Sequence, residues 1–174
     1  MNINLLKVDS LSDIASVARL AQEIWRQHFT PIIGSSQVEY MLEKFQSAEA
    51  ILSQMETGTE YYIAVLENEH VGYTGLVPDV SNKKMMISKI YLRNRARGNG
   101  IGNHILNFVE DESKKRNFNK IWLTVNRFNH DTIEWYSRKG FETVDKVKKD
   151  IGGGFFMDDY IMEKQITLAA RDTK

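Results

Sequence analysis

The residues best suited to chemistry are the glycines at positions 98, 100 and 102, which separate an apolar stretch from a helical one. The first N–H groups of a helix have no partner within the helix and carry partial positive charge, so a helix start attracts anions. Because glycine has no Cβ, the backbone there can approach a pyrophosphate closely. Additional positive charge lies just before the glycines, at Arg93, Arg95 and Arg97. This segment is therefore expected to bind phosphate.

The spacing of the glycines distinguishes between phosphate-binding motifs. A dinucleotide fingerprint requires Gly-x-Gly-x-x-Gly, but Asn103 occupies the place of its third glycine. A Walker loop requires Gly-Lys-Ser or Gly-Lys-Thr, which this segment lacks. The run Arg97-Gly-Asn-Gly-Ile-Gly102 instead resembles the Arg/Gln-x-x-Gly-x-Gly/Ala signature of the GNAT superfamily of N-acetyltransferases. The resemblance implies binding of the acetyl-CoA (acetyl-coenzyme A) pyrophosphate by Arg97, Gly98, Asn99, Gly100, Ile101, Gly102 and Asn103.

A second segment supports this resemblance. The run Asn129-His-Asp-Thr-Ile-Glu-Trp-Tyr-Ser-Arg-Lys-Gly-Phe141 is similar to the family's Asn-x-x-Ala-Ile-x-Phe-Tyr-x-Lys-x-Gly-Phe. The resemblance implies that Asn129 binds the cofactor arm and that Tyr136 is the general acid for the departing thiolate. A phenol of pKa about 10 can protonate a thiolate of pKa about 8.5. Without the resemblance, Tyr136 would be taken for a packed aromatic residue beside Trp135.

The resemblance also implies two splayed central strands with the pantetheine arm between them, like an added strand. The backbone of Ile90, Tyr91 and Leu92 would then bind the arm, and an N–H group there would polarise the thioester carbonyl. Within the superfamily the chain is most similar to the bacterial Pai-type polyamine (spermidine/spermine) acetyltransferases, at Lys89-Ile-Tyr-Leu92 and Asp159-Tyr-Ile-Met162. A polyamine or another small amine is the expected acceptor.

The sequence leaves the general base open. A primary amine of pKa about 10 is mostly charged at neutral pH and must lose a proton before it attacks. Many members of the family use a glutamate on the central strand, where this chain has Ser88 and Lys89. The candidates for a base acting through water are Glu23, His28, Glu60, Asp158 and Asp159. Contact between the acceptor and His28 or Phe29 is also open.

Composition restricts the remaining choices. The 174 residues, 42% hydrophobic and 26% charged, fit a single domain, which we expect over residues 1–166 with a C-terminal tail at 167–174. The absence of cysteine excludes disulfides and acyl transfer through an enzyme thiol, and no histidine pair has metal-ligand spacing, so no metal is expected. A formal net charge of zero argues against nucleic-acid binding. Without a bilayer-length apolar stretch or a signal sequence, we expect a cytoplasmic protein with no membrane partner.

The periodicity of apolar residues indicates the elements. Helices are expected after the capping box Ser10–Asp13 and over 38–45 and 48–55, with a break near Ser47 and with turn residues at 30–31 and 34–36. The expected strands and later helices are strand 3–8, strands 61–66, 71–77 and 85–92, helix 103–116, strand 120–125, helix 131–139, and strands 142–149 and 155–166. They predict an α+β, GNAT-like domain with a mixed, mostly antiparallel sheet of about seven strands, flanked by helices and splayed at the central strands.

The leading hypothesis is an N-acetyltransferase that moves an acetyl group from acetyl-CoA to a primary amine by direct attack in a ternary complex. One alternative is a protein or peptide N-acetyltransferase, which would need an open groove. Another is a non-catalytic acyl-CoA-binding sensor, which would have no use for Tyr136. Association into a homodimer through the C-terminal strands is left open.

Overall fold

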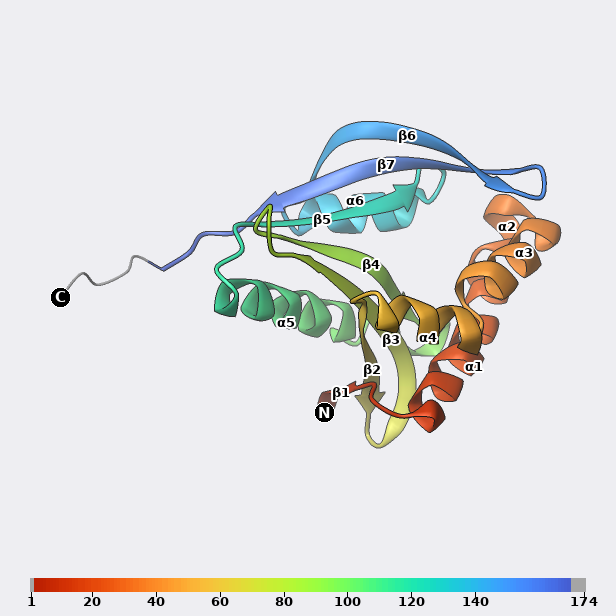
Figure 1. Ribbon diagram of the computed structural model, residues 1–174, viewed down its shortest axis with the longest axis horizontal. Coiled ribbons are helices and arrows are strands. Elements are labelled where there is room, and N and C mark those ends of the chain that lie inside the picture. The colour runs from red at the N-terminus through yellow and green to blue at the C-terminus, as the bar shows by residue number, and fades with distance from the viewer. Residues whose placement is uncertain (1, 170–174) are drawn as a thin grey trace.

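A seven-stranded sheet forms the centre of the computed structural model, which describes residues 2–169 (Figure 1). Its strand order is β1-β2-β3-β4-β5-β7-β6. The strands are β1 (Ile3–Lys7), β2 (Glu60–Leu66), β3 (Glu69–Asp79), β4 (Lys84–Leu92), β5 (Lys120–Asn126), β6 (Glu142–Gly152) and β7 (Phe155–Gln165). Within this sheet β4 and β5 are parallel and every other pair is antiparallel. The predicted α+β fold with a mixed, mostly antiparallel sheet is confirmed.

Helices cover both faces of the sheet. The first four are α1 (Leu11–His28), α2 (Thr30–Ile33), α3 (Ser35–Phe45) and α4 (Ala48–Glu56), and the later two are α5 (Ile101–Lys115) and α6 (His130–Arg138). Because strand side chains alternate, Tyr61 and Ile63 of β2 join the core cluster of α1–α4, whereas Tyr62 and Ala64 join the cluster of α5 and α6. The sheet therefore separates two hydrophobic cores.

Side-chain caps begin two of the helices near the predicted places. Ser10 Oγ accepts a hydrogen bond from Asp13 N at 3.1 Å, as expected of a capping box. The return bond differs, because Asp13 Oδ2 accepts from Asp9 N at 3.3 Å and not from Ser10 N, so the capping box is not reciprocal. Ser47 Oγ accepts from Ala50 N at 3.2 Å and begins α4. The turns expected at 30–31 and 34–36 are largely wrong, because 30–33 form the short helix α2, whose early proline is compatible with a helix start, and α3 begins at Ser35, so only Gly34 separates the two helices.

A β-bulge in β4 determines which side chains face which core. Between the pairs that β4 makes with β3, Ser88 is one extra residue on β4. Before it, Met85 and Ile87 pack in the core of α5; after it, Tyr91 packs in the core of α1–α4. A bulge of one residue shifts the alternation by one position. It therefore turns Lys89 and Tyr91 toward α1–α4.

The two central strands separate beyond this bulge (Figure 1). Their parallel ladder runs only from Lys84–Lys120 to Ile87–Leu123. Further on, β4 stays paired with β3, and β5 stays paired with β7 as far as Asn126. The facing backbone edges of β4 and β5 thus have no ladder partner there, and the predicted splay is confirmed.

The hairpin of β6 and β7 reaches across to α3 (Figure 1). The hydroxyl of Tyr40 donates to the Ile151 carbonyl at 2.6 Å, and Gln37 Nε2 donates to the Phe156 carbonyl at 2.9 Å. β7 ends at Gln165, near the predicted domain end, and residues 170–174 of the predicted tail lie outside the described residues. No helix within residues 2–169 is long and apolar enough to cross a membrane.

Candidate active site

The glycine loop has the geometry of an anion cradle. A short 3-10 turn, η1 (Asn94–Ala96), precedes it, and Gly98 and Gly100 have φ angles of 78° and 75°, which residues with a Cβ adopt at a cost. Gly100 is the N-cap of α5. Within residues 2–169, the N–H groups of residues 98–103 have no hydrogen-bond acceptor. Such a run of unpaired amides at a helix start can surround a phosphate.

A groove of about 490 Å³ joins this loop to the splayed strands. Most of the residues predicted to bind the cofactor line it: Ile90, Tyr91, Leu92, Arg97, Gly98, Gly100, Gly102, Asn103 and Asn129. Two do not. The side chain of Ile101 is buried in the α5 core, and Asn99 Nδ2 donates to the Ala96 carbonyl at 3.5 Å.

Gly102 also has a packing role. A Cβ at this position would lie 2.8 Å from Cζ2 of Trp135, which is closer than packed carbon atoms approach. Its lack of a side chain lets the first turn of α5 pack against α6. Sequence alone could not separate this role from close approach to a pyrophosphate.

A larger cavity of about 760 Å³ lies on the other side of the splay. Its apolar wall comes from α1–α3, with Trp25, Phe29 and Met41. Its far wall comes from β6 and β7, so the contact of this hairpin with α3 closes one side. The cavity and the groove share six lining residues: Phe29, Ile90, Tyr91, Asn129, Thr132 and Tyr136.

Tyr136 lies where the two spaces meet. It is only 3% exposed, and its ring packs edge-on against Trp135 and Phe141. Within the described residues its hydroxyl has no hydrogen-bond partner, although other buried tyrosines such as Tyr73 do. Burial raises the pKa of Tyr136, and the nearby Tyr91 phenol raises it further. The phenol therefore stays protonated at neutral pH, and its O–H is available as a hydrogen-bond donor to a group bound at the junction.

Asn129 is the N-terminal neighbour of α6, yet its side chain does not cap the helix. It is 6% exposed and lines both spaces.

His28 lines the groove but not the larger cavity, and its Nδ1 lies 3.2 Å from Arg97 Nη1. Burial and the Arg97 guanidinium lower the pKa of His28, partly offset by hydrogen bonding to Asn129. The imidazole is therefore neutral at pH 7, and Phe29 rather than His28 faces the larger cavity.

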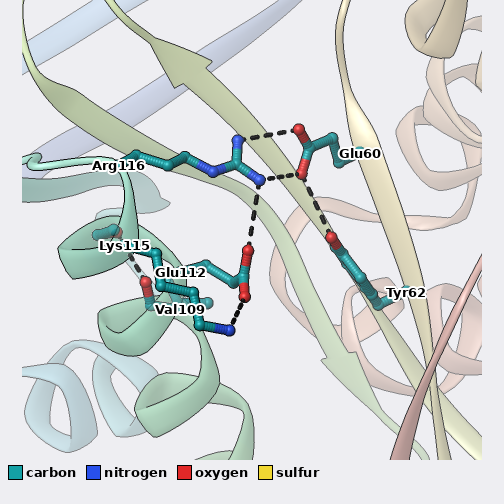
Figure 2. Close-up of polar contacts among 7 residues, drawn as sticks. Glu60, Tyr62, Val109, Glu112, Lys115 and Arg116 are labelled. Atoms are coloured by element: carbon teal, nitrogen blue, oxygen red, sulfur yellow. Dashed lines mark hydrogen bonds and ion pairs between the residues drawn. The ribbon is translucent and has the colours of Figure 1, made fainter.

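Three of the five candidates for the base are bound to arginines. Figure 2 shows the Glu60 carboxylate between Arg116, at 2.9 and 2.8 Å, and the Tyr62 hydroxyl. Glu23 Oε2 lies 2.9 Å from an Arg93 nitrogen, and Asp158 Oδ2 lies 3.2 Å from Arg127 Nε. None of these three carboxylates lines the larger cavity, and His28 does not line it either.

Asp159 differs from the other candidates. It lines the larger cavity, is 6% exposed and has no ion-pair partner within residues 2–169. Burial raises its pKa to about 6, opposed by a hydrogen bond from Thr124. Neighbouring side chains of a strand point to opposite faces, and the two aspartates do so: Asp158 contacts Arg127, whereas Asp159 lines the cavity.

One cavity residue was noticed in the sequence but given no role. The Nζ atom of Lys89 donates hydrogen bonds to Gln54 Oε1 and to the Tyr61 hydroxyl. Neither partner carries a sequence signal, because both contacts depend on how α4 packs over the sheet. No group of three or more histidine, cysteine, aspartate or glutamate side chains in the described part of the chain could hold a metal ion.

Comparisons with known proteins agree with this geometry. A model of the Acetyltransferase (GNAT) family matches residues 17–141. The PaiA N-acetyltransferase from Thermoplasma acidophilum, solved with coenzyme A, has a TM-score of 0.76 at 24% identity, covering 95% of this chain and 99% of its own. A GCN5-related N-acetyltransferase from Rhodopseudomonas palustris has a TM-score of 0.79 at 14% identity, covering 95% and 97%. The ribosomal-protein-S18-alanine N-acetyltransferase from Escherichia coli has a TM-score of 0.72 at 15% identity, covering 99% of each chain. At these identities the structures show a shared fold.

Proposed function

Because the chain belongs to the Acetyltransferase (GNAT) family and so is an acyl-CoA-dependent transferase, we propose that it acetylates a primary amine of a small molecule held in the larger cavity. The observation that carries the proposal is the meeting of the two spaces at Tyr136. The groove ends at the glycine loop, whose geometry suits a phosphate, and the larger cavity is closed on one side by the β6–β7 hairpin. An acyl donor and an amine could therefore meet at this residue.

The residues of the groove fit acetyl-CoA. The unpaired N–H groups of residues 98–103 suit its pyrophosphate, with Arg97 beside them. The unpaired edges of β4 and β5 suit an extended arm that forms strand-like hydrogen bonds. When bound, acetyl-CoA supplies a thioester whose acyl carbon accepts the amine nitrogen while the C–S bond breaks and the sulfur leaves as a thiolate.

The proposed proton transfers use two side chains. Asp159, ionised at pH 7, removes one proton from the ammonium group of the acceptor so that the nitrogen lone pair becomes free to form the C–N bond. Tyr136 gives its proton to the departing thiolate. The nitrogen gains positive charge as the C–N bond forms and loses its second proton, through solvent, to the phenolate, which burial makes a strong base by raising its pKa. A backbone N–H on the unpaired edge of β4, near Ile90, would stabilise the negative charge that develops on the thioester carbonyl oxygen as the C–N bond forms.

The charges of the cavity bear on the polyamine hypothesis. Its charged lining residues are Lys44, Lys89, Lys149, Asp150 and Asp159. Three cations against two anions would repel a polycation such as spermidine. A peptide acceptor is also disfavoured, because contacts such as that between Tyr40 and Ile151 close one side of the cavity. A small amine of another kind is the better fit.

Release of the free thiol of coenzyme A, followed over polyamines, amino acids, aminoglycosides and peptides, tests the proposal. Turnover with a small amine, and weaker turnover with peptides, is the expected result. Tight binding of coenzyme A with no turnover on any acceptor would instead support the sensor hypothesis.

A further inference from the structure

A buried lysine faces the acceptor cavity without a counter-charge. Lys89 is 6% exposed and lines the larger cavity, where the bulge at Ser88 directs it. Within residues 2–169, no carboxylate lies within 4.0 Å of its Nζ atom. Lysine is almost never fully buried unless it is paired, because removing an ammonium group from water is costly. This position therefore needs an anion or a functional reason.

The hydrogen bonds around Lys89 favour its charged form. The Tyr61 hydroxyl donates to Gln54 Oε1 at 2.5 Å, so its hydrogen is already used and its oxygen accepts from Lys89. Gln54 Oε1 is the second acceptor. An ammonium group has one more N–H than these two acceptors use. Burial lowers the pKa of Lys89 to about 8, which leaves the group mostly protonated at pH 7.

We propose that Lys89 binds a carboxylate of the acceptor, so that the substrate is an amino acid or a related amine bearing a carboxylate. This inference rests on the proposed function. A cationic nitrogen with a free N–H is a natural partner for a carboxylate, and charge-assisted hydrogen bonds of this kind are strong in a buried site.

The positions of the charges suit a zwitterion. The Tyr91 phenol interacts electrostatically with both Tyr61, the partner of Lys89, and Asp159. The lining of this cavity thus contains both a cation, Lys89, and an anion, Asp159, together with Tyr91. The carboxylate of an amino acid would contact Lys89, and its ammonium group would contact Asp159, the proposed base. The other lining acid, Asp150, accepts a hydrogen bond from Gly152 N at 2.8 Å.

The test compares acceptors that differ only in the carboxylate: methionine with 3-(methylthio)propylamine, tryptophan with tryptamine, arginine with agmatine, and lysine with cadaverine. The wild-type protein should have a higher kcat/KM for the acid in the pairs it accepts. Lys89→Met should lower kcat/KM for the acid about 10- to 100-fold, mainly through KM, and change that of the decarboxylated amine less than about 3-fold. The control Lys148→Met changes an exposed lysine of β6 that does not line the cavity, and should change neither.

A wild-type preference for the decarboxylated amines would overturn the inference and leave the proposed function standing. An equal fall in kcat/KM for the acid and for its decarboxylated amine in Lys89→Met would also overturn the inference, because it would indicate a general structural role for Lys89. The wild-type comparison stands even if the variant does not fold. Absence of turnover with every amine would overturn the proposed function, and the inference with it.

Discussion

Nη1 of Arg97 lies 3.2 Å from Nδ1 of His28, so the glycine loop contacts the C-terminal end of α1. The neutral imidazole accepts a hydrogen bond from the guanidinium, and both side chains line the groove. Arg97 Nε also donates to the Leu92 carbonyl at 3.3 Å, which links the loop to the end of β4. One side chain thus connects the phosphate cradle with the strand edge that we expect to hold the cofactor arm.

Arg97→Met should therefore weaken binding of coenzyme A about 10-fold, because a charge-assisted contact to phosphate is lost. Isothermal titration calorimetry measures the dissociation constant. Arg95→Met is the matched control, since Arg95 pairs with Glu69 and does not line the groove, and it should bind coenzyme A as the wild type does. Equal weakening in both variants would contradict a specific role for Arg97.

Asp159→Asn should lower kcat/KM about 100-fold by removing the proposed base. Asp158→Asn, which changes the neighbouring carboxylate paired with Arg127, should stay within about 3-fold of the wild type in steady-state assays. The wild-type kcat/KM should fall at acid pH with an apparent pKa of about 6, as Asp159 becomes protonated. Loss of activity in Asp158→Asn alone would reverse this assignment.

The same substitution should stabilise the protein. Since burial raises the pKa of Asp159 from 3.8 to about 6, the folded state binds its proton more tightly, and this side chain's contribution to stability decreases as the pH rises from 3.8 to 6. At pH 7 the buried carboxylate is ionised at a cost. Asp159→Asn should then raise the free energy of unfolding by about 1–3 kcal/mol in urea denaturation. A loss of stability at pH 7 would contradict the assigned environment.

Gly102→Ala should destabilise the protein by about 1–2 kcal/mol, because the new Cβ would overlap the ring of Trp135. In a Trp135→Leu background the same change should cost less, since the smaller side chain leaves room. Thermal unfolding of the four proteins of this cycle measures the coupling. The same cost in both backgrounds would mean that Gly102 is needed for a reason other than this contact.

Glu60 should contribute to stability and not to catalysis, because Arg116 holds both its carboxylate oxygens (Figure 2). Glu60→Gln should leave kcat within about 2-fold and lower the free energy of unfolding by about 1–2 kcal/mol. Hydrogen bonds from Arg116 lower the pKa of Glu60 below 4.5, so its contribution is present above pH 4.5 and lost as the pH falls through the lower folded-state pKa. A large fall in kcat with unchanged stability would contradict this role.

Local patterns were sufficient to predict the glycine turn before a helix and the strands of the sheet, because the spacing of the glycines and the alternation of apolar residues depend on near neighbours. The role of Tyr136 came from the resemblance to the family and stays a prediction. The orientation of Lys89 could not be predicted, since the bulge at Ser88 arises from pairing with β3. Strand alternation alone is enough to place Asp158 and Asp159 on opposite sides of β7. Which of the two aspartates faces the cavity depends on the register of β7 with β5 and β6.

The ion pair of Glu60 joins residues that are 56 positions apart, so the sequence could not remove this residue from the candidates for the base. His28 illustrates the same limit. Its place at the end of α1 was compatible with either space, and the contact with Arg97 places it in the groove.

The central claim, that Tyr136 is the general acid at the junction of the two spaces, is tested most directly by the turnover number of Tyr136→Phe. We predict a fall in kcat of about 100-fold or more, with the dissociation constant of coenzyme A changed less than about 3-fold. Tyr160→Phe, which removes a hydroxyl outside both spaces, should behave as the wild type. An unchanged kcat in Tyr136→Phe would contradict the account.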